Sequence, residues 1–293
     1  MEKEVKHIIL DICHDLGIKC TLVSKDWIFL LEKDNKTVFL TGYKFPSNNH
    51  ALGMVLDDKY ALYDVLKYKK YPVVEYNIVY NEKNMEDYAQ GCNSFDYVKN
   101  YFITHNQNIV LKPNDGTCGR DVYHVTDLST LEELYYKLTR KYYSINIGPF
   151  YDIQNEYRFV IYNNEVRIAY KKNKPVIYGD DVKTIRQLLI DFNPDYFTNK
   201  LNDSIYDTVL PNGREYEYNW KFNLSGGAVA TPIEDQELYN KLSKIAIDST
   251  KEIGLKFGSV DIIYTKDKES YILEMNSGVM LENYVKQFDN GYE

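Results

Sequence analysis

Two apolar runs near the end of the sequence, SVDIIYT and SYILEMN, constrain the fold more than any other feature. They are rich in β-branched and aromatic residues, and the charged segment Lys266-Asp267-Lys268-Glu269 separates them, which predicts an antiparallel hairpin. With a four-residue loop, counting back along both strands places Asp261 opposite Glu274. Asn276 shares the face of Glu274 because side chains alternate along a strand.

Directly opposed carboxylates on neighbouring strands repel each other. The surrounding apolar residues leave Asp261 and Glu274 poorly solvated, so both remain ionised only beside a compensating charge. Oxygen ligands from Asp, Glu and Asn are those that Mg²⁺ and Mn²⁺ prefer. A solvent-facing polar side of the hairpin explains the same residues equally well, and a slip of one residue in register separates the two acids. These residues alone leave both interpretations open.

A second feature is the segment IVLKPNDGTCGRDVYHV, in which glycines lie between two strand-like runs. Gly116 and Gly119 allow the backbone to approach an anion with its N–H groups pointing inward. Lys112, at the end of the first run, places a cation beside that anion. The segment is not a Walker A loop, because no Gly-Lys-Ser/Thr closes it and a strand follows where a helix is required. Taken alone, it is more typical of a glycine-containing hairpin turn.

A third feature is Lys59 in the first turn of a predicted helix, DDKYALYDVLKYKK. Asp57 or Asp58 is placed to cap this helix, which follows the polar connection 46–53. A lysine in the first turn is disfavoured by the helix dipole, which weakly indicates another role, such as phosphate binding. On its own, Lys59 is more typical of a surface lysine.

The remaining pattern alternates helices with hairpin-linked strands, which predicts an α+β architecture. The clearest helices are an amphipathic one within 1–17, one within 129–141 and a long one over 236–254. Strand pairs are predicted around turns at Asp34-Asn35-Lys36 and Asn163-Asn164.

Composition and charge exclude several classes of protein. The 293 residues suffice for two domains or several subdomains, and a net charge of −8 argues against a nucleic-acid partner. No apolar run approaches the roughly 20 residues that cross a bilayer, and the acidic N-terminal helix is unlike a signal peptide. The four cysteines show no CxxC pair or metal-ligand spacing, so reduced thiols are expected. We therefore expect a cytoplasmic protein with no membrane partner.

Taken together and in this order, the three features resemble the ATP-grasp superfamily. In that family a lysine after an aspartate opens the first helix, as in Asp58-Lys59, and a second lysine ends a strand, as in Leu111-Lys112-Pro113. A final Asp and Glu-x-Asn set binds magnesium, here Asp261, Glu274 and Asn276. The resemblance implies ATP together with Mg²⁺ or Mn²⁺.

From about Leu52 to Val285, the chain looks most like cyanophycin synthetases and the related glutathione-forming ligases. The segments that follow the running order of this subgroup are Glu156-Tyr157-Arg158, Lys171-Lys172, Pro175 to Asp180, Thr184 to Leu188 and Asn223 to Gly227. The resemblance implies two α+β subdomains that clasp ATP, preceded by a small N-terminal α/β region. The implied divisions are 1–57, 58–148 and 149–293.

The resemblance also implies a set of site residues. Those expected to bind ATP, through its phosphates, the glycine loop and the adenine-side hinge, are Lys59, Lys112, Asp115, Gly116, Thr117, Cys118, Gly119, Pro149, Phe150, Tyr151, Asp152 and Glu156. Those expected to serve acyl transfer are Arg158, Lys221, Asn223, Ser225, Gly226 and Gly227. Arg158, Lys221 and the N–H groups of Ser225-Gly226-Gly227 would stabilise an oxyanion. For Arg158 the alternative is an ion pair with Glu156 or Asp152.

Several positions depart from the pattern of the family. Asp121 stands where a further glycine is common in the phosphate loop, and Asp181 replaces the last glycine of a GDG-like turn. Pro149 stands where the hinge frequently carries an acid, so ribose binding would fall to Asp152 or Glu156. A lysine at 221 also replaces a frequent arginine, which keeps the charge but loses bidentate geometry.

The function implied by the resemblance is an ADP-forming carboxylate–amine ligase that works through an acyl phosphate. An amino acid or short peptide is the expected substrate, and a homodimer is left open. One alternative is a kinase-like ATP-grasp enzyme that phosphorylates its substrate without condensation; the Ser225-Gly226-Gly227 loop argues against it, since acyl transfer needs such donors. The other is a non-catalytic nucleotide-binding or scaffold protein, against which the presence of Glu274 and Asn276 argues.

Overall fold

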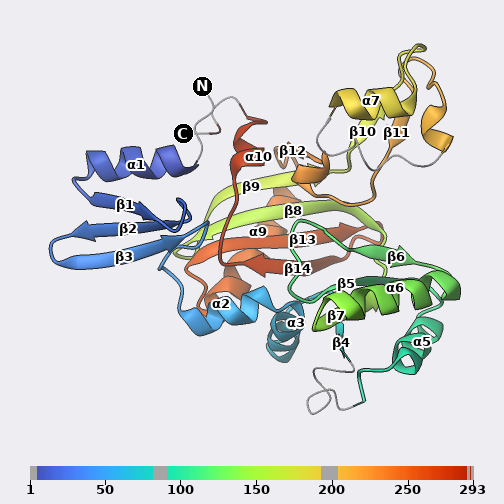
Figure 1. Ribbon diagram of the computed structural model, residues 1–293, viewed down its shortest axis with the longest axis horizontal. Helices are drawn as coiled ribbons and strands as arrows, with labels where there is room; N and C mark the ends of the chain where they lie inside the picture. Colours follow the sequence, from blue (N-terminus) through green and yellow to red (C-terminus); the bar gives the residue numbers. More distant parts are fainter. Residues whose placement is uncertain (1–4, 82–90, 193–203, 289–290, 292–293) are drawn as a thin grey trace. The chain divides into compact units, whose positions relative to one another are not determined.

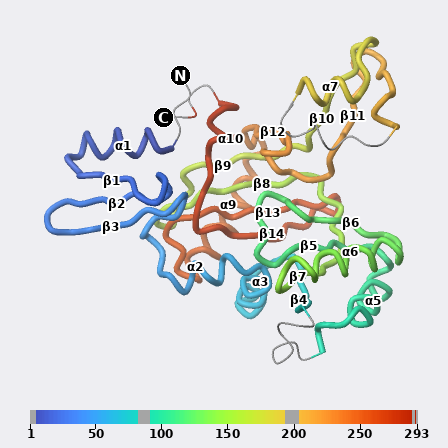
Figure 2. The backbone as a smooth tube through the Cα atoms, viewed as in Figure 1, coloured from blue at the N-terminus to red at the C-terminus, as the bar shows by residue number. Residues whose placement is uncertain are grey.

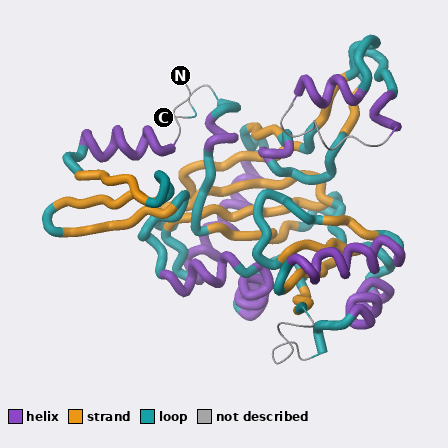
Figure 3. Tube along the Cα trace, viewed as in Figure 1, coloured by secondary structure: helices purple, strands orange, loops and turns teal. Residues whose placement is uncertain are grey.

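The computed structural model describes residues 5–81, 91–192, 204–288 and 291 (Figures 1 and 2). The chain divides into two compact units. Unit 1 consists of Met1–Ala169 and Ile233–Glu282, and unit 2 of Tyr170–Pro232 and Asn283–Glu293. Helices and antiparallel sheets occur in both, so the predicted α+β class is confirmed (Figure 3).

The N-terminal part of unit 1 is a small α/β layer. Its elements are α1 (Val5–Asp15), β1 (Lys19–Val23), β2 (Ile28–Lys33) and β3 (Lys36–Thr41). The strands form an antiparallel sheet in the order β1-β2-β3, with the predicted turn at Asp34-Asn35. Ile9 and Cys13 of α1 pack on Phe29 and Leu40, so one face of the helix covers one face of the sheet (Figure 1).

A four-stranded sheet with two helices positions the end of the Lys112 strand. Its elements are β4 (Asn77–Tyr80), α5 (Phe95–Thr104), β5 (Ile109–Pro113), β6 (Tyr123–Val125), α6 (Leu128–Lys141) and β7 (Ser144–Pro149). The strand order is β4-β7-β5-β6, so β5 has a partner on each side. Phe102 of α5 and Leu131 of α6 join Leu111 and Ile147 of the sheet in one fully buried cluster. This packing fixes the strand that precedes the glycine loop.

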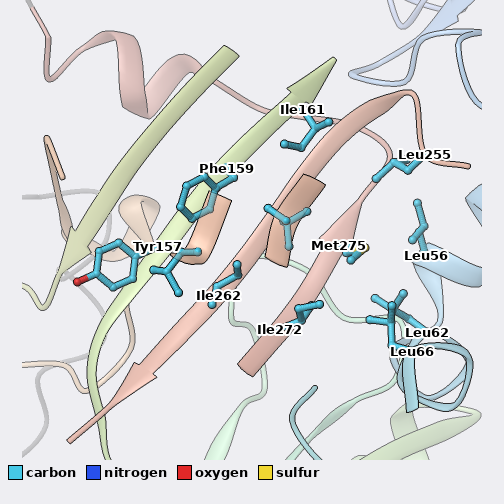
Figure 4. Packing of buried hydrophobic residues seen from close by; sticks show 13 residues of the cluster. Leu56, Leu62, Leu66, Tyr157, Phe159, Ile161, Leu255, Ile262, Ile272 and Met275 are labelled. Atoms are coloured by element: carbon cyan, nitrogen blue, oxygen red, sulfur yellow. The ribbon is translucent and has the colours of Figure 1, made fainter. Parts of the chain in front are cut away.

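The largest sheet of unit 1 has helices on one face and polar side chains on the other. Its strands are β8 (Ile153–Tyr162), β9 (Glu165–Asn173), β13 (Phe257–Thr265) and β14 (Ser270–Asn276), in the order β9-β8-β13-β14. The helices are α2 (His50–Asp57), α3 (Lys59–Tyr68) and α9 (Gln236–Ile253). Leu56 and Leu66 lie in one cluster with Ile262 and Ile272 (Figure 4). Leu242 of α9 belongs to the same cluster. Each such buried side chain stabilises the fold by about 1.5–3 kcal/mol.

Helix α2 corrects the sequence interpretation, which expected a polar connection over 46–53. Asn49 caps α2 by accepting a hydrogen bond from the Leu52 N–H at 2.9 Å. Asp58 caps α3 in the same way, with the Ala61 N–H at 2.8 Å. A side-chain oxygen at the N-cap satisfies an N–H that has no partner inside the helix. Asp58 is therefore the cap of the two acids considered, and the following lysine opens α3.

Unit 2 is built from short elements. They are β10 (Val176–Tyr178), α7 (Ile185–Phe192), the 3₁₀ turns η1 (Ser204–Asp207) and η2 (Leu224–Gly226), β11 (Glu215–Glu217) and β12 (Val229–Thr231), while α10 (Glu282–Val285) begins at the last residue of unit 1. β10 pairs with β11, and β12 pairs with the end of β9. Ile177, Ile185, Leu189 and Leu210 form its small core.

In the parts of the chain that the structure describes, no helix is both long and apolar enough to span a membrane. The divisions 1–57, 58–148 and 149–293 rest on correspondence to the family and stay a prediction.

Candidate active site

A row of charged side chains crosses the polar face of the large sheet. Asp261 of β13 lies opposite Arg158 of β8 on one side and opposite Glu274 of β14 on the other. The predicted pairing of Asp261 with Glu274 is therefore confirmed. The row runs from the cation Arg158 to the anions Asp261 and Glu274, so Asp261 already has a compensating charge.

The strand register that produces this pairing differs from the predicted register. Ser270 pairs with Tyr264 and not with Thr265. This offset alone would place Asp261 opposite Leu273 instead of Glu274. A β-bulge next to Asp261 leaves Leu273 without a cross-strand partner and restores the register. An early offset and a later bulge thus cancel, and Glu274 faces Asp261.

Arg158 and Asp261 form a bidentate ion pair. The Arg158 Nε donates to Oδ1 of Asp261 at 2.7 Å, and Nη2 donates to Oδ2 at 2.5 Å. Asp261 is only 1% exposed, so this pair lies in a medium of low dielectric. Of the acids weighed from the sequence, Glu156 and Asp152, neither holds the guanidinium in this bidentate pair. Its partner is Asp261, which lies 103 positions away from Arg158 along the chain.

The donor set at this row fits a hard divalent cation. Asp261, Glu274 and Asn276 offer oxygen atoms only, and the Asn276 amide donates to Oε1 of Glu274 at 3.3 Å. Within the described residues, no three His, Cys, Asp or Glu side chains gather in a metal-holding group. Two carboxylates and one amide are too few to enclose an ion. This is the pattern expected of Mg²⁺, which keeps several water or phosphate oxygens.

Lys112 is a buried lysine close to Glu274 and Glu156. Its Nζ donates to the Tyr76 hydroxyl at 2.5 Å and lies 4.1 Å from the centre of the Tyr76 ring. Burial first, and then the charge of Lys59, lowers the pKa of Lys112 to about 7, while Glu274 and Glu156 act in the opposite direction. The structure thus brings together both predicted phosphate lysines and two of the predicted acids.

Tyr76 is a residue that sequence reasoning missed. Its hydroxyl accepts from Lys112 and donates to the Leu273 carbonyl at 3.2 Å. It therefore joins the phosphate lysine to the strand that carries Glu274. The sequence VVEYNIVY indicated only a strand, and no local signal distinguished this tyrosine from the others.

Lys59 holds the backbone of the glycine loop. Its Nζ donates to the Gly116 carbonyl at 2.5 Å and to the Asn114 carbonyl at 3.3 Å. The Asn114 side chain accepts from the Tyr60 N–H at 3.1 Å and from the Asn146 amide at 2.8 Å. This buried network fixes the start of α3 against the start of the loop, and sequence reasoning anticipated neither asparagine.

The glycine loop contains several left-handed residues. Cys118, Gly119 and Asp121 have φ of 57°, 64° and 54°. Asp121, which stands where the family commonly has glycine, adopts this conformation with its carboxylate held by Lys141 and Tyr142, each at 2.6 Å. These bonds lower the pKa of Asp121 to about 2. The departure from the family pattern anchors the end of the loop.

Of the expected hinge residues, Pro149 ends β7, and Phe150, Tyr151 and Asp152 follow it. Phe150 stacks on His124 with ring centres 3.8 Å apart, and the Tyr151 hydroxyl accepts from the Glu75 N–H at 3.1 Å. The Asp152 carboxylate pairs with Lys266 at 2.8 Å. Of the two acids considered for ribose, Asp152 is therefore tied to the β13–β14 turn, while Glu156 is buried beside Lys112.

The predicted acyl-transfer loop lies in unit 2. Gly227 has φ of 94°, and a Cβ there would stand 2.0 Å from the Tyr218 hydroxyl, so only glycine is accommodated. The N–H groups of Gly226 and Gly227 donate to the Asn223 and Leu224 carbonyls at 2.9 and 3.1 Å. In this conformation, two of the expected oxyanion donors are engaged inside the turn itself.

Comparisons with known proteins bear on the fold of the chain. No curated protein matches the sequence. Residues 201–290 match the RimK-like ATP-grasp domain family. A bifunctional glutathione synthetase from Pasteurella multocida is similar over 96% of this chain and 40% of its own, with 15% identity and a TM-score of 0.54. This chain has the ATP-grasp fold.

Two further solved structures share the ATP-grasp fold. D-alanine–D-alanine ligase from Bacillus anthracis is similar over 78% of this chain and 59% of its own, with 15% identity and a TM-score of 0.51. The ATP-grasp ligase PsnB, complexed with a phosphomimetic variant of a minimal precursor, Mg and ADP, is similar over 84% of this chain and 57% of its own, with 14% identity and a TM-score of 0.50. This chain thus spans less than two thirds of the length of each of these three proteins.

Proposed function

We propose that this ATP-grasp chain is an ADP-forming carbon–nitrogen ligase that joins a carboxylate to an amine, on an amino acid or short peptide. The convergence within unit 1 of Lys59, Lys112 and the Asp261, Glu274 and Asn276 set carries the proposal. Binding a triphosphate and its metal requires this combination of buried cations and oxygen ligands.

Both lysines have donors available for phosphate. An ammonium has three N–H groups. Lys112 directs one to Tyr76, and Lys59 directs two to carbonyls of residues 114–116, so each retains capacity for a phosphate oxygen. A bound Mg²⁺ or Mn²⁺ would supply neutralising charge to the phosphates, held by Asp261, Glu274 and Asn276.

Arg158 takes a positioning role in this proposal, in place of the oxyanion role expected from the sequence. Its guanidinium holds both oxygens of Asp261, which fixes the orientation of that carboxylate and limits its negative charge. Lys221, Asn223 and Ser225 of unit 2 remain the candidates for contact with the acyl group.

The proposed reaction has two steps. A carboxylate oxygen of the substrate attacks the γ-phosphorus of ATP, and the bond to ADP breaks. The amine nitrogen then attacks the acyl carbon, phosphate leaves with the bonding electrons, and the nitrogen loses a proton. Positioning and electrostatic stabilisation by the two lysines account for most of the catalysis in such a transfer.

Trapping the activated carboxylate tests the proposal. The protein is incubated with Mg²⁺, ATP, hydroxylamine and pools of amino acids and dipeptides, and both hydroxamate and ADP are measured. We expect equal amounts of the two with wild type and neither with Lys112→Met, while Lys137→Met, an exposed lysine of α6, behaves as wild type. Phosphorylated substrate without hydroxamate would establish the kinase alternative, and absent Mg·ATP binding would contradict the proposal altogether.

A further inference from the structure

A short segment of the N-terminal region is joined to the end of the strand that carries Glu274. Lys44 forms an antiparallel bridge with Gly278, which lies two residues beyond Asn276. A Cβ on Gly278 would stand 3.1 Å from the Tyr43 carbonyl oxygen, so the two backbones are in close contact. Tyr43 is thereby placed at the end of the proposed metal-binding strand.

The Tyr43 side chain reaches two further segments of unit 1. Its hydroxyl lies near the Glu282 carboxylate, and the charges of that carboxylate and of the Cys118 thiol in the glycine loop both act on it. Burial, and then these two neighbours, raise the pKa of Tyr43 to about 12, so the phenol keeps its proton at neutral pH. The N-terminal region therefore contacts the segment after β14 at Tyr43 and Lys44.

Glu282 has an incomplete set of partners. Its Oε2 atom is buried and, among the residues that the structure describes, accepts no hydrogen bond. The same residues provide no ion pair to its carboxylate, and the neighbouring Lys44 is paired with Asp57 at 2.5 Å. Burying a carboxylate oxygen without a donor is costly, and a cationic hydrogen-bond donor would offset that cost most fully.

We propose that Glu282 and Tyr43 form a subsite for a protonated amino group of a substrate, next to the glycine loop. The ammonium would donate to Oε2 of Glu282, with the Tyr43 hydroxyl beside the same carboxylate. This inference rests on the proposed ligase function and extends it, because it identifies a substrate that carries a free ammonium group. It also gives the N-terminal region a role at the site.

Binding of a simple alkylammonium ion tests the subsite directly. Propylammonium chloride is titrated against the full-length protein by ligand-observed NMR, with potassium chloride holding the ionic strength constant. The variants are Glu282→Gln, Tyr43→Phe and the control Glu269→Gln, which makes the same change at an exposed turn. Calorimetric titration with Mg·ADP on the same samples reports the nucleotide site, and melting temperatures report folding.

We expect Glu282→Gln to weaken propylammonium binding about tenfold or more, because a charged hydrogen bond is lost. Tyr43→Phe weakens it by a smaller factor, and Glu269→Gln and all Mg·ADP affinities stay at wild-type values. Equal binding to wild type and Glu282→Gln would overturn the subsite, as would Mg·ADP binding to wild type without propylammonium binding. Should Glu282→Gln fail to fold, Tyr43→Phe decides by the same comparison. Loss of Mg·ADP binding in wild type would instead count against the ligase proposal.

Discussion

Replacing Arg158 with methionine is expected to destabilise the protein by about 3–5 kcal/mol in the absence of metal. Asp261 has 1% of its surface exposed, so removing its partner leaves an uncompensated buried carboxylate, and such a loss typically has this size. Arg158→Lys retains the positive charge but loses the second of two parallel hydrogen bonds, so about half of that loss is expected.

Two further variants separate the ion pair from the rest of the Arg158 side chain. Arg158→Met combined with Asp261→Asn removes both charges, and most of the stability should return. Arg167→Met serves as the matched control on the neighbouring strand β9. Arg167 pairs with Glu165 at 2.9 Å but is 56% exposed, so its replacement changes stability by about 1 kcal/mol or less.

Urea unfolding with EDTA and with saturating Mn²⁺ measures these free energies. The account predicts that Mn²⁺ restores part of the stability of Arg158→Met, since the ion replaces the lost positive charge beside Asp261. Paramagnetic resonance should show tighter Mn²⁺ binding to this variant than to wild type. A loss no larger than that of Arg167→Met, with Mn²⁺ affinity unchanged, would refute the assignment of Arg158 and Asp261 to one metal-binding row.

Three other predictions concern the nucleotide site. Because the pKa of free Lys112 is about 7 and phosphate favours the protonated form, Mg·ADP affinity should fall by up to about fivefold between pH 7 and pH 8, with proton uptake visible as a buffer-dependent heat of binding; pH-independent affinity without proton uptake would contradict this. Asp121→Asn should lower the free energy of unfolding at pH 7 by about 1–2 kcal/mol; since the folded pKa lies near 2, the stabilisation by Asp121 is complete above about pH 4 and is lost as the pH falls through about 2, so the difference in urea unfolding should be about halved near pH 3 and vanish only below about pH 2. Bound Mg·ADP should slow alkylation of the exposed Cys118 about tenfold or more by mass spectrometry, with the half-buried Cys92 as internal reference, and equal slowing at both cysteines would argue against a nucleotide under the loop.

Local pattern was sufficient for most of the longer helices and strands, though not for α2, and for one feature of the site. Alternation in β13 and β14 predicted that Asp261 faces Glu274, and the strong apolar character of both strands made that outcome robust to an error in the turn. A shift at Tyr264 and the bulge at Leu273 compensate each other because the buried face must stay apolar. The sequence contains no evident sign of that bulge.

Contacts between distant segments were not predictable in the same way. Arg158 and Asp261 meet because β8 and β13 are neighbours in the sheet, and nothing in either strand specifies that pairing. Tyr76 is one of 29 tyrosines, and only the fold shows that its hydroxyl lies between Lys112 and the Leu273 carbonyl. The partner of Glu282 was hidden for the same reason, since Tyr43 lies in a region with no diagnostic motif.

The most direct test of the central claim is ADP release with Mg²⁺ against pools of amino acids, dipeptides and simple amines, with product masses recorded. Glu274→Gln is measured alongside wild type, and Glu269→Gln controls for the same change on an exposed turn. The account predicts substrate-dependent ADP release by wild type and Glu269→Gln, with a condensed product heavier by the amine less water, and no release by Glu274→Gln. Equal ADP release by Glu274→Gln, or ADP formation without any condensed product, would contradict it.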